Sequence, residues 1–361
     1  MGWKRLIRRT WTPFEPGISR KLFITMAIIS LADRFSELQE LTCDVCVIGA
    51  GMAGLVAALR LAGNGFGRVV VVESGGKEFD PAVHDLNQID NPLTNYQHGV
   101  DGRYRGLGGS SSQWGGKLLP LSPSDAEDRA YVNEPAWPLK LEELDQYRRE
   151  IEALFQIDGE SYEEDAVELW DGKRQTPRGD EDFALRYPKW PADMGLQMNI
   201  WIEQLPHWEN RLVLSDKLDS LGVPMARIEW RATDMEERTF RACVSRLQSY
   251  WHRHKIGRFC KLDLVKEACE QSVPITSLAD DRNHPSGSTR MGIDPVRSVV
   301  RSDLRTHEVE NLSVASASVF PSAGSANPTY TILQMAMHAA DAITRRGSGV
   351  KLSIPATAIA P

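Results

Sequence analysis

A glycine-rich turn between two apolar runs constrains the fold of this 361-residue chain more than any other feature. Residues 49–54 have the pattern G-x-G-x-x-G and directly follow the apolar run 45–48. A helical stretch rich in leucine and alanine comes next, over 55–62, and then a valine-rich run over 68–73. Strand, turn, helix and strand in this order predict a βαβ unit. The fold class that follows is α/β, with a parallel, doubly wound sheet of the Rossmann type.

Each part of this turn has a physical task in binding a dinucleotide. Gly49 permits the tight turn, Gly51 lets backbone amides approach a pyrophosphate, and Gly54 lets helix and strand pack closely. The positive end of the helix dipole adds to the attraction. Glu73, at the end of the second apolar run, is placed to accept hydrogen bonds from the adenosine ribose. The position of the turn and the residues after Glu73 resemble those of flavoproteins that bind the adenine half of FAD there, which favours FAD over NAD. A purely structural glycine turn is the alternative.

Composition excludes several classes of function. With 42% hydrophobic and 25% charged residues, the chain resembles an ordinary globular protein of two domains. The net charge of −7 argues against a nucleic-acid partner, which would need clustered Lys and Arg. The cysteines show no metal-site spacing, so no metal is expected. Cys43 and Cys46 have the spacing of a redox pair, yet they lie in an apolar run that indicates a buried strand instead.

The N-terminal region leaves alternatives open. Its first 21 residues are basic and are followed by an apolar run over 22–31. That run is shorter than the about 20 residues that cross a bilayer, so no transmembrane segment is expected. Residues 30–32 are loosely cleavage-like, which leaves a signal peptide open, and a translation start at Met26 is another interpretation. We treat 1–40 as an N-terminal extension and expect a cytoplasmic protein, with a periplasmic or exported one as the alternative.

A second glycine-rich loop covers residues 105–116 and contains Trp114. Small residues there let the backbone lie against a cofactor, and the loop amides can bind phosphate or flavin edges. An ordinary glycine-rich surface loop is the alternative.

A third motif pairs a histidine with an asparagine. His284 opens the pattern H-x-x-G-x-x-x-M, and Asn327 follows 43 residues later, directly before Pro328. Oxidation of an alcohol needs a base with a pKa near neutrality and a second group that fixes the C–H bond toward the acceptor. His284 suits the first task and Asn327 the second, although a single histidine is often structural. Pro328 suits the first turn of a helix predicted to reach Ile343.

The three motifs together resemble the glucose–methanol–choline (GMC) oxidoreductases, especially the bacterial branch that oxidises sugars and related polyols. The resemblance implies that His284 takes the proton from the substrate hydroxyl while hydride leaves the adjacent carbon for flavin N5. It also implies that Asn327 hydrogen-bonds the same hydroxyl. In some sugar oxidases of the family a histidine bonds covalently to the flavin, and Gln113 stands at that position here. The resemblance therefore implies a noncovalent FAD.

The predicted site joins a catalytic pair to a larger set of cofactor-binding residues. The catalytic pair is His284 and Asn327, and no metal ligand is predicted. The cofactor-binding residues come from the nucleotide turn, the acidic strand end, the glycine loop and the region around the last helix: Gly49, Gly51, Met52, Ala53, Gly54, Glu73, Ser74, Arg105, Gly108, Gly109, Ser110, Ser111, Trp114, Gly115, Gly116, Ala317, Pro328 and Thr329.

Glycine-rich ends around a polar middle predict two domains. Residues 41–125 and 284–350 form a discontinuous FAD-binding domain, and 126–283 form a smaller α+β substrate or cap region. Local patterns in the cap region predict a helix over 139–155, a strand over 210–215 and a helix over 236–252.

The cap region is shorter than in the family. Between Trp190 and about Gln204 the sequence passes directly to a part that family members carry far downstream. The Ala-x-Gly-Gly motif that completes the nucleotide sheet in relatives is absent from residues 117–283. We therefore expect an incomplete Rossmann-type sheet.

These observations predict a flavoprotein that oxidises the CH–OH group of a sugar or polyol and passes the electrons to an acceptor that the sequence does not identify. The missing segment favours an alternative, a catalytically impaired FAD- or nucleotide-binding remnant or truncated product of a GMC oxidoreductase. An NAD-dependent enzyme that uses only the first βαβ unit leaves the two later motifs unexplained.

Overall fold

A computed structural model of the chain gives the positions of residues 7–11, 22–26, 28–30, 42–93, 96, 102–157, 198–258, 260–270, 272, 274, 281, 283–347 and 352–353. Most of the predicted N-terminal extension, 1–40, lies outside these residues. The first part of the segment between Trp190 and Gln204, where the sequence departs from the family, also lies outside them. All of the predicted site residues lie within them.

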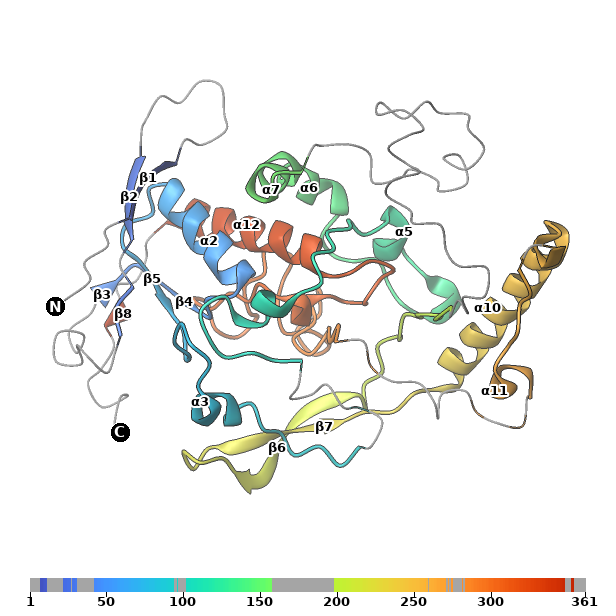
Figure 1. Cartoon of the computed structure of the whole chain (residues 1–361). Coiled ribbons are helices and arrows are strands. Elements are labelled where there is room, and N and C mark those ends of the chain that lie inside the picture. Colours follow the sequence, from blue (N-terminus) through green and yellow to red (C-terminus); the bar gives the residue numbers. More distant parts are fainter. Residues whose placement is uncertain are drawn as a thin grey trace.

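Two parallel strands and two helices form the centre of the molecule (Figure 1). Strand β4 (Val45–Ile48) pairs in parallel with β5 (Val69–Val72), and α2 (Met52–Gly63) connects them. Helix α12 (Thr329–Arg346), from the other end of the chain, lies beside α2. The predicted βαβ unit and the mixed α/β fold are therefore confirmed.

The side chains of α12 explain why it lies at the centre. It is buried on nearly every side from Tyr330 to Ala342, which is typical of a helix inside a core rather than on a surface. Ala340 packs with Leu61 of α2 and with Phe66, in the turn between α2 and β5. The small alanine lets the two helices approach closely, and burial of a side chain such as Leu61 contributes about 2 kcal/mol.

The parallel sheet is short, as predicted. Within the part of the chain that the structure describes, it holds β4 and β5 alone. At the carboxyl ends of these strands, Ile48 is 85% exposed and Val72 is 44% exposed. Strands of a complete parallel sheet are normally covered on both faces, so this exposure supports the expectation of an incomplete sheet.

Two small antiparallel pairs complete the description of the chain ends: β1 (Ile7–Trp11) with β2 (Leu22–Met26), and β3 (Thr42–Cys43) with β8 (Leu352–Ser353). Cys43 and Cys46 are free thiols and lie in two separate strands, β3 and β4. Cys43 is buried but Cys46 is only half-buried, so the prediction of one buried strand is confirmed only in part. None of the helices in the described ranges is long and apolar enough to cross a bilayer.

The helix predicted over 139–155 consists of two short helices, α6 (Leu141–Asp145) and α7 (Arg148–Phe155). Between them the Tyr147 amide donates to the Leu144 carbonyl, three residues back, at 3.1 Å, which tightens the chain. The other short helices are α3 (Pro81–Asp85), α5 (Pro123–Ala126), α11 (Lys266–Cys269) and the 3-10 turns η1 (Gly109–Gln113), η2 (Ala130–Val132), η3 (Ile256–Arg258) and η5 (Ala317–Val319).

A hairpin and a long helix follow residue 205. Strands β6 (Arg211–Leu218) and β7 (Pro224–Glu229) pair antiparallel, which extends the strand predicted over 210–215. Helix α10 (Asp234–Arg253) confirms the predicted helix and points away from the centre (Figure 1). It begins at Thr233, whose Oγ1 accepts from the Met235 amide at 3.2 Å and so caps the helix.

A charged cluster ties α2 to α12. Arg60 donates from Nε and Nη2 to the two carboxylate oxygens of Asp341 at 2.6 and 2.8 Å. The Tyr147 hydroxyl donates to Asp341 Oδ2 at 3.0 Å. Burial alone would raise the pKa of Asp341, but the hydrogen bonds and charge of Arg60 outweigh it and leave this pKa below its ordinary value.

Arg60 also pairs with Glu150 through Nη1. Replacing Asp341 with asparagine should lower the free energy of unfolding by about 1 kcal/mol at pH 7, because the partly buried charge of Arg60 loses one of its two counter-charges. The folded-state pKa of Asp341 is lowered, so its contribution is complete above the unfolded value of about 3.9 and is lost as the pH falls below it. Urea unfolding of wild type and Asp341→Asn at pH 7 and about pH 3 measures this. A difference that stays the same at both pH values would contradict the prediction.

Candidate active site

The nucleotide turn follows β4 and lies against the carboxyl end of β5. Gly49 leaves β4 with φ of +98°, a conformation that glycine adopts readily, and its amide donates to the Val72 carbonyl at 2.8 Å. The Ala50 amide donates to Glu73 Oε2 at 2.8 Å. The predicted ribose-binding carboxylate therefore lies against the turn, where strand ends of a doubly wound sheet commonly bind ligands.

The space around two glycines differs sharply. A Cβ added at Gly54 would lie 2.0 Å from the Gly49 carbonyl oxygen, so only glycine fits there. This agrees with the close packing of helix and strand predicted for Gly54. A Cβ added at Gly51 would meet nothing closer than the Gly108 carbonyl oxygen, at 3.8 Å. The backbone at Gly51 is therefore open to an approaching group.

The second glycine loop packs directly on this turn. The Gly108 amide donates to the Ala50 carbonyl at 3.1 Å, and the Met52 amide donates to Ser111 Oγ at 3.0 Å. Ser110 Oγ accepts from the Tyr104 amide at 3.0 Å. Two motifs that are separate in the sequence thus form one backbone surface at the start of α2.

Arg105 and Trp114 anchor the two ends of the glycine loop. Arg105 donates to Ser74 Oγ at 3.1 Å and to Asn87 Oδ1 at 2.8 Å. The Trp114 ring meets Phe155 of α7 edge to face, with the ring centroids 5.7 Å apart. The loop is therefore held between the acidic strand end and α7.

The structure brings His284 and Asn327 into direct contact. Asn327 Nδ2 lies 3.1 Å from His284 Nε2, which is hydrogen-bond distance. Asn327 directly precedes Pro328, which caps α12, and Thr329 is the first residue of that helix. The pair is thus formed by a loop and a helix N-terminus that are 43 residues apart in the sequence.

Backbone pairing fixes the loop that carries His284. The Gly287 amide donates to the Ala317 carbonyl at 3.1 Å, and the Met291 amide donates to the Val319 carbonyl at 2.7 Å. Ala317 and Val319 are buried in η5. The predicted cofactor residue Ala317 therefore holds the loop of the histidine through its backbone.

The loop before Asn327 is fixed by carboxylates. Asp125 of α5 accepts from the Ser325 amide at 3.1 Å and from the Ser325 hydroxyl at 2.7 Å. Glu203 accepts from the Gly324 amide at 2.9 Å. Gly324 has φ of +74°, and a Cβ there would lie 2.5 Å from Leu121. These contacts leave little freedom in the position of Asn327.

His284 is exposed enough for a small molecule to reach it. Partial burial of its ring lowers its pKa below the ordinary value, and the charge of Lys117 lowers the pKa further. The imidazole is therefore neutral at pH 7, as a base must be before it takes a proton.

Two residues beside His284 were not predicted from the sequence. The ring centroids of Trp201 and His284 lie 6.2 Å apart at an interplanar angle of 66°. Lys117 Nζ lies 5.9 Å from the centroid of the Trp201 ring. Lys117 directly follows the predicted loop residues Gly115 and Gly116, and this position could have indicated that Lys117 lies near the site. Trp201 lies between Trp190 and Gln204, where the sequence departs from the family, and belongs to no motif.

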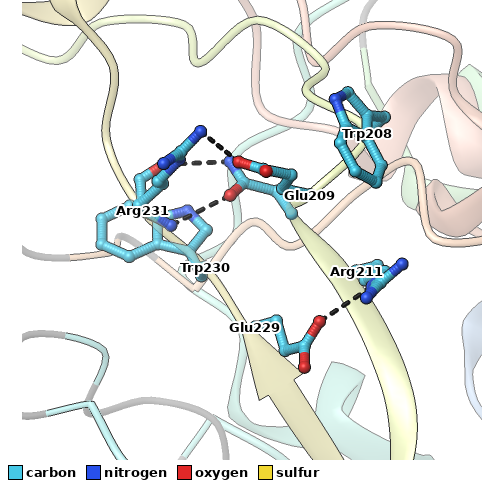
Figure 2. Close-up of a pocket in the computed structure, with 7 residues that line it drawn as sticks. Trp208, Glu209, Arg211, Glu229, Trp230 and Arg231 are labelled. Carbon is cyan, nitrogen blue, oxygen red and sulfur yellow. Dashed lines mark hydrogen bonds and ion pairs between the residues drawn. The ribbon is translucent and has the colours of Figure 1, made fainter.

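A separate pocket of about 270 Å³ lies at the end of the β6–β7 hairpin, and it shares no lining residue with the predicted site. Figure 2 shows that its charged side chains pair with one another. Arg211 Nε donates to Glu229 Oε2 at 2.8 Å, and Arg231 forms an ion pair with Glu209. These charges are balanced within the hairpin, so the pocket is less suited to a charged ligand.

Two protein-family models match separate segments of the chain. Residues 206–336 match the family model described as GMC oxidoreductase, and residues 44–79 match the FAD binding domain. The match over residues 206–336 agrees with the predicted resemblance to the GMC oxidoreductases. These matches agree with the predicted FAD cofactor. The turn, Glu73 and the glycine loop, which are the residues predicted to bind FAD, lie in contact with one another.

Two curated proteins and one solved structure are similar to parts of this chain. The fructose dehydrogenase large subunit of Gluconobacter japonicus is 33% identical over 142 residues, which cover 39% of this chain and 24% of that protein. The 6'''-hydroxyparomomycin C oxidase of Streptomyces lividus is 31% identical over 138 residues, covering 38% and 23%. Among solved structures, pyridoxine 4-oxidase from Mesorbium loti has a TM-score of 0.44 at 15% identity, covering 84% of this chain and 99% of that chain. The chain thus spans about a quarter of the length of the curated relatives it matches.

Proposed function

We propose that the chain is an FAD-dependent oxidoreductase that oxidises a hydroxyl group of a sugar or polyol, with His284 as the base. The observation that carries this proposal is the 3.1 Å contact between His284 Nε2 and Asn327 Nδ2 at the N-terminus of α12. The names of the two curated relatives, fructose dehydrogenase and 6'''-hydroxyparomomycin C oxidase, support a hydroxyl-bearing substrate.

The geometry suggests how the pair divides the work. The amide of Asn327 can only donate from Nδ2, so Nε2 of His284 accepts and carries no proton in this arrangement. The single lone pair of Nε2 accepts this bond, so a substrate hydroxyl that enters between the two side chains replaces the bond and gives its proton to Nε2. Asn327 is placed to hydrogen-bond the same hydroxyl and orient the neighbouring C–H bond. FAD, when bound, supplies the acceptor for the hydride.

The test uses the full chain expressed with FAD available. A visible flavin band that bleaches after anaerobic addition of a sugar and polyol mixture would support the proposal. A protein that retains FAD but is not reduced by any of these compounds would contradict it. The second candidate, a catalytically impaired FAD-binding remnant, is favoured by the short parallel sheet and would then be the better description.

The rate of flavin reduction should rise with pH through a pKa below 6.5, because only the neutral imidazole of His284 accepts a proton. Replacing Lys117 with methionine removes the positive charge that disfavours the imidazolium, so this pKa should rise toward 6.5. Lys117→Arg keeps the charge and should keep the wild-type profile. The measurement is kcat/KM at intervals of about 0.5 pH units from about pH 5 to about pH 8. A Lys117→Met profile that coincides with wild type would count against the role of this charge.

A further inference from the structure

Three consecutive residues fasten the segment beside His284 to different parts of the fold. Glu203 accepts from Arg129 Nη1 at 2.6 Å and from the Gly324 amide at 2.9 Å. Gly324 lies three residues before Asn327. The Glu203 carboxylate therefore ties this segment to the loop that ends at the catalytic asparagine.

The next two residues fasten the same segment to the hairpin and to α10. Gln204 accepts from Trp230 Nε1 at 2.6 Å and donates to the Arg231 carbonyl at 3.0 Å. Trp230 and Arg231 are drawn in Figure 2 at the end of β7. The Leu205 amide donates to Glu236 Oε1 of α10 at 3.3 Å.

These anchors fix the region of Trp201 beside the catalytic histidine. The ring of Trp201 meets the ring of His284 edge to face, and the ammonium group of Lys117 lies near the same indole. Trp201 nevertheless stays 56% exposed. A large apolar ring that is held in place, is half open to solvent and adjoins a base has the properties of a binding wall rather than of core packing.

We propose that Trp201 is the substrate-contacting wall of the His284–Asn327 site and receives the C–H face of a ring-shaped polyol. The face of an indole carries partial negative charge, and the axial C–H bonds of a pyranose or cyclitol carry partial positive charge, so the two stack. The hydroxyls at the rim of the ring stay free to meet His284, Asn327 and Lys117. A linear polyol offers no such face. This inference names the substrate class and rests on the proposed function.

Binding is tested separately from turnover by saturation-transfer NMR on the FAD-loaded full chain. The probes are glucose, fructose and myo-inositol, with linear glycerol for comparison. We expect at least one ring polyol to bind wild type with the strongest transfer on its ring C–H protons. Trp201→Leu should weaken that binding about 10-fold, or about 1.4 kcal/mol. Trp201→Phe, which keeps an aromatic face, should stay within about 3-fold of wild type, as should Trp208→Leu, a change at an exposed tryptophan of the hairpin.

Flavin reduction by the same polyols supplies the second readout. For a ring polyol that binds, Trp201→Leu should raise KM about 10-fold and leave kcat within about 3-fold, because the indole holds the substrate and takes no part in proton transfer. The inference would be overturned if the Trp201→Leu variant bound ring polyols as tightly as wild type does. It would also be overturned if wild type bound none of the ring polyols. Binding that depends on Trp201 without flavin reduction would instead contradict the proposed function alone.

Discussion

Replacing His284 with alanine is expected to lower the rate of flavin reduction by the substrate about 10³-fold, the largest kinetic effect in this chain. The variant loses the proposed acceptor of the hydroxyl proton, and Asn327 cannot replace it because an amide is not a base at neutral pH. The measurement is stopped-flow reduction of the bound flavin under anaerobic conditions. Since His284 is not part of the nucleotide turn, the variant should still show the flavin absorption band.

His252→Ala provides the matched control, because this histidine is exposed on α10 and belongs to no predicted site. It should reduce flavin at the wild-type rate. Asn327→Ala should fall between the two, since the base remains but the hydroxyl is less well oriented. If His284→Ala loses less than about 10-fold, the base is a different group and the assignment of His284 is wrong.

Local patterns account for the part of the fold that could be predicted from the sequence. The βαβ unit depends on valine runs, a leucine- and alanine-rich helix and three glycines, all within residues 45–73. The helix after Pro328 was predictable for the same reason. The contact between His284 and Asn327 was expected only through the resemblance to GMC oxidoreductases, since nothing in the spacing alone places the two side chains together.

Contacts between distant residues explain what could not be predicted. The helix predicted over 139–155 breaks near Tyr147, whose hydroxyl bonds to Asp341, 194 residues away. Trp201 is placed by neighbours that hold Glu203, among them Arg129, 74 residues back in the sequence. No local pattern records such partners. Lys117 could have been considered from its place after the glycine loop, but its effect on His284 depends on the folded geometry.

Replacing Gly54 with alanine should abolish FAD binding and lower the free energy of unfolding by about 3 kcal/mol. The added methyl group would lie 2.0 Å from the Gly49 carbonyl oxygen and 3.3 Å from Val47 Cγ1. The first neighbour is backbone, so the contact cannot be relieved by a side-chain rotation. The turn must shift, and the amides that face the predicted pyrophosphate shift with it. Urea unfolding and the flavin absorption of the purified protein measure the two effects.

Gly51→Ala separates cofactor binding from folding. Its methyl group would meet Gly108 and Ser111 at 3.8 and 3.9 Å, which is ordinary contact, and Gly51 has φ of −71°, which alanine adopts easily. Stability should therefore change by less than about 1 kcal/mol, whereas FAD binding should weaken because the methyl group stands where the pyrophosphate must approach. Gly76→Ala, where an added Cβ has no neighbour within 4 Å, should leave both properties unchanged. A Gly51→Ala protein that binds FAD as tightly as wild type would mean that the phosphates do not approach this turn, whatever happens to Gly54→Ala.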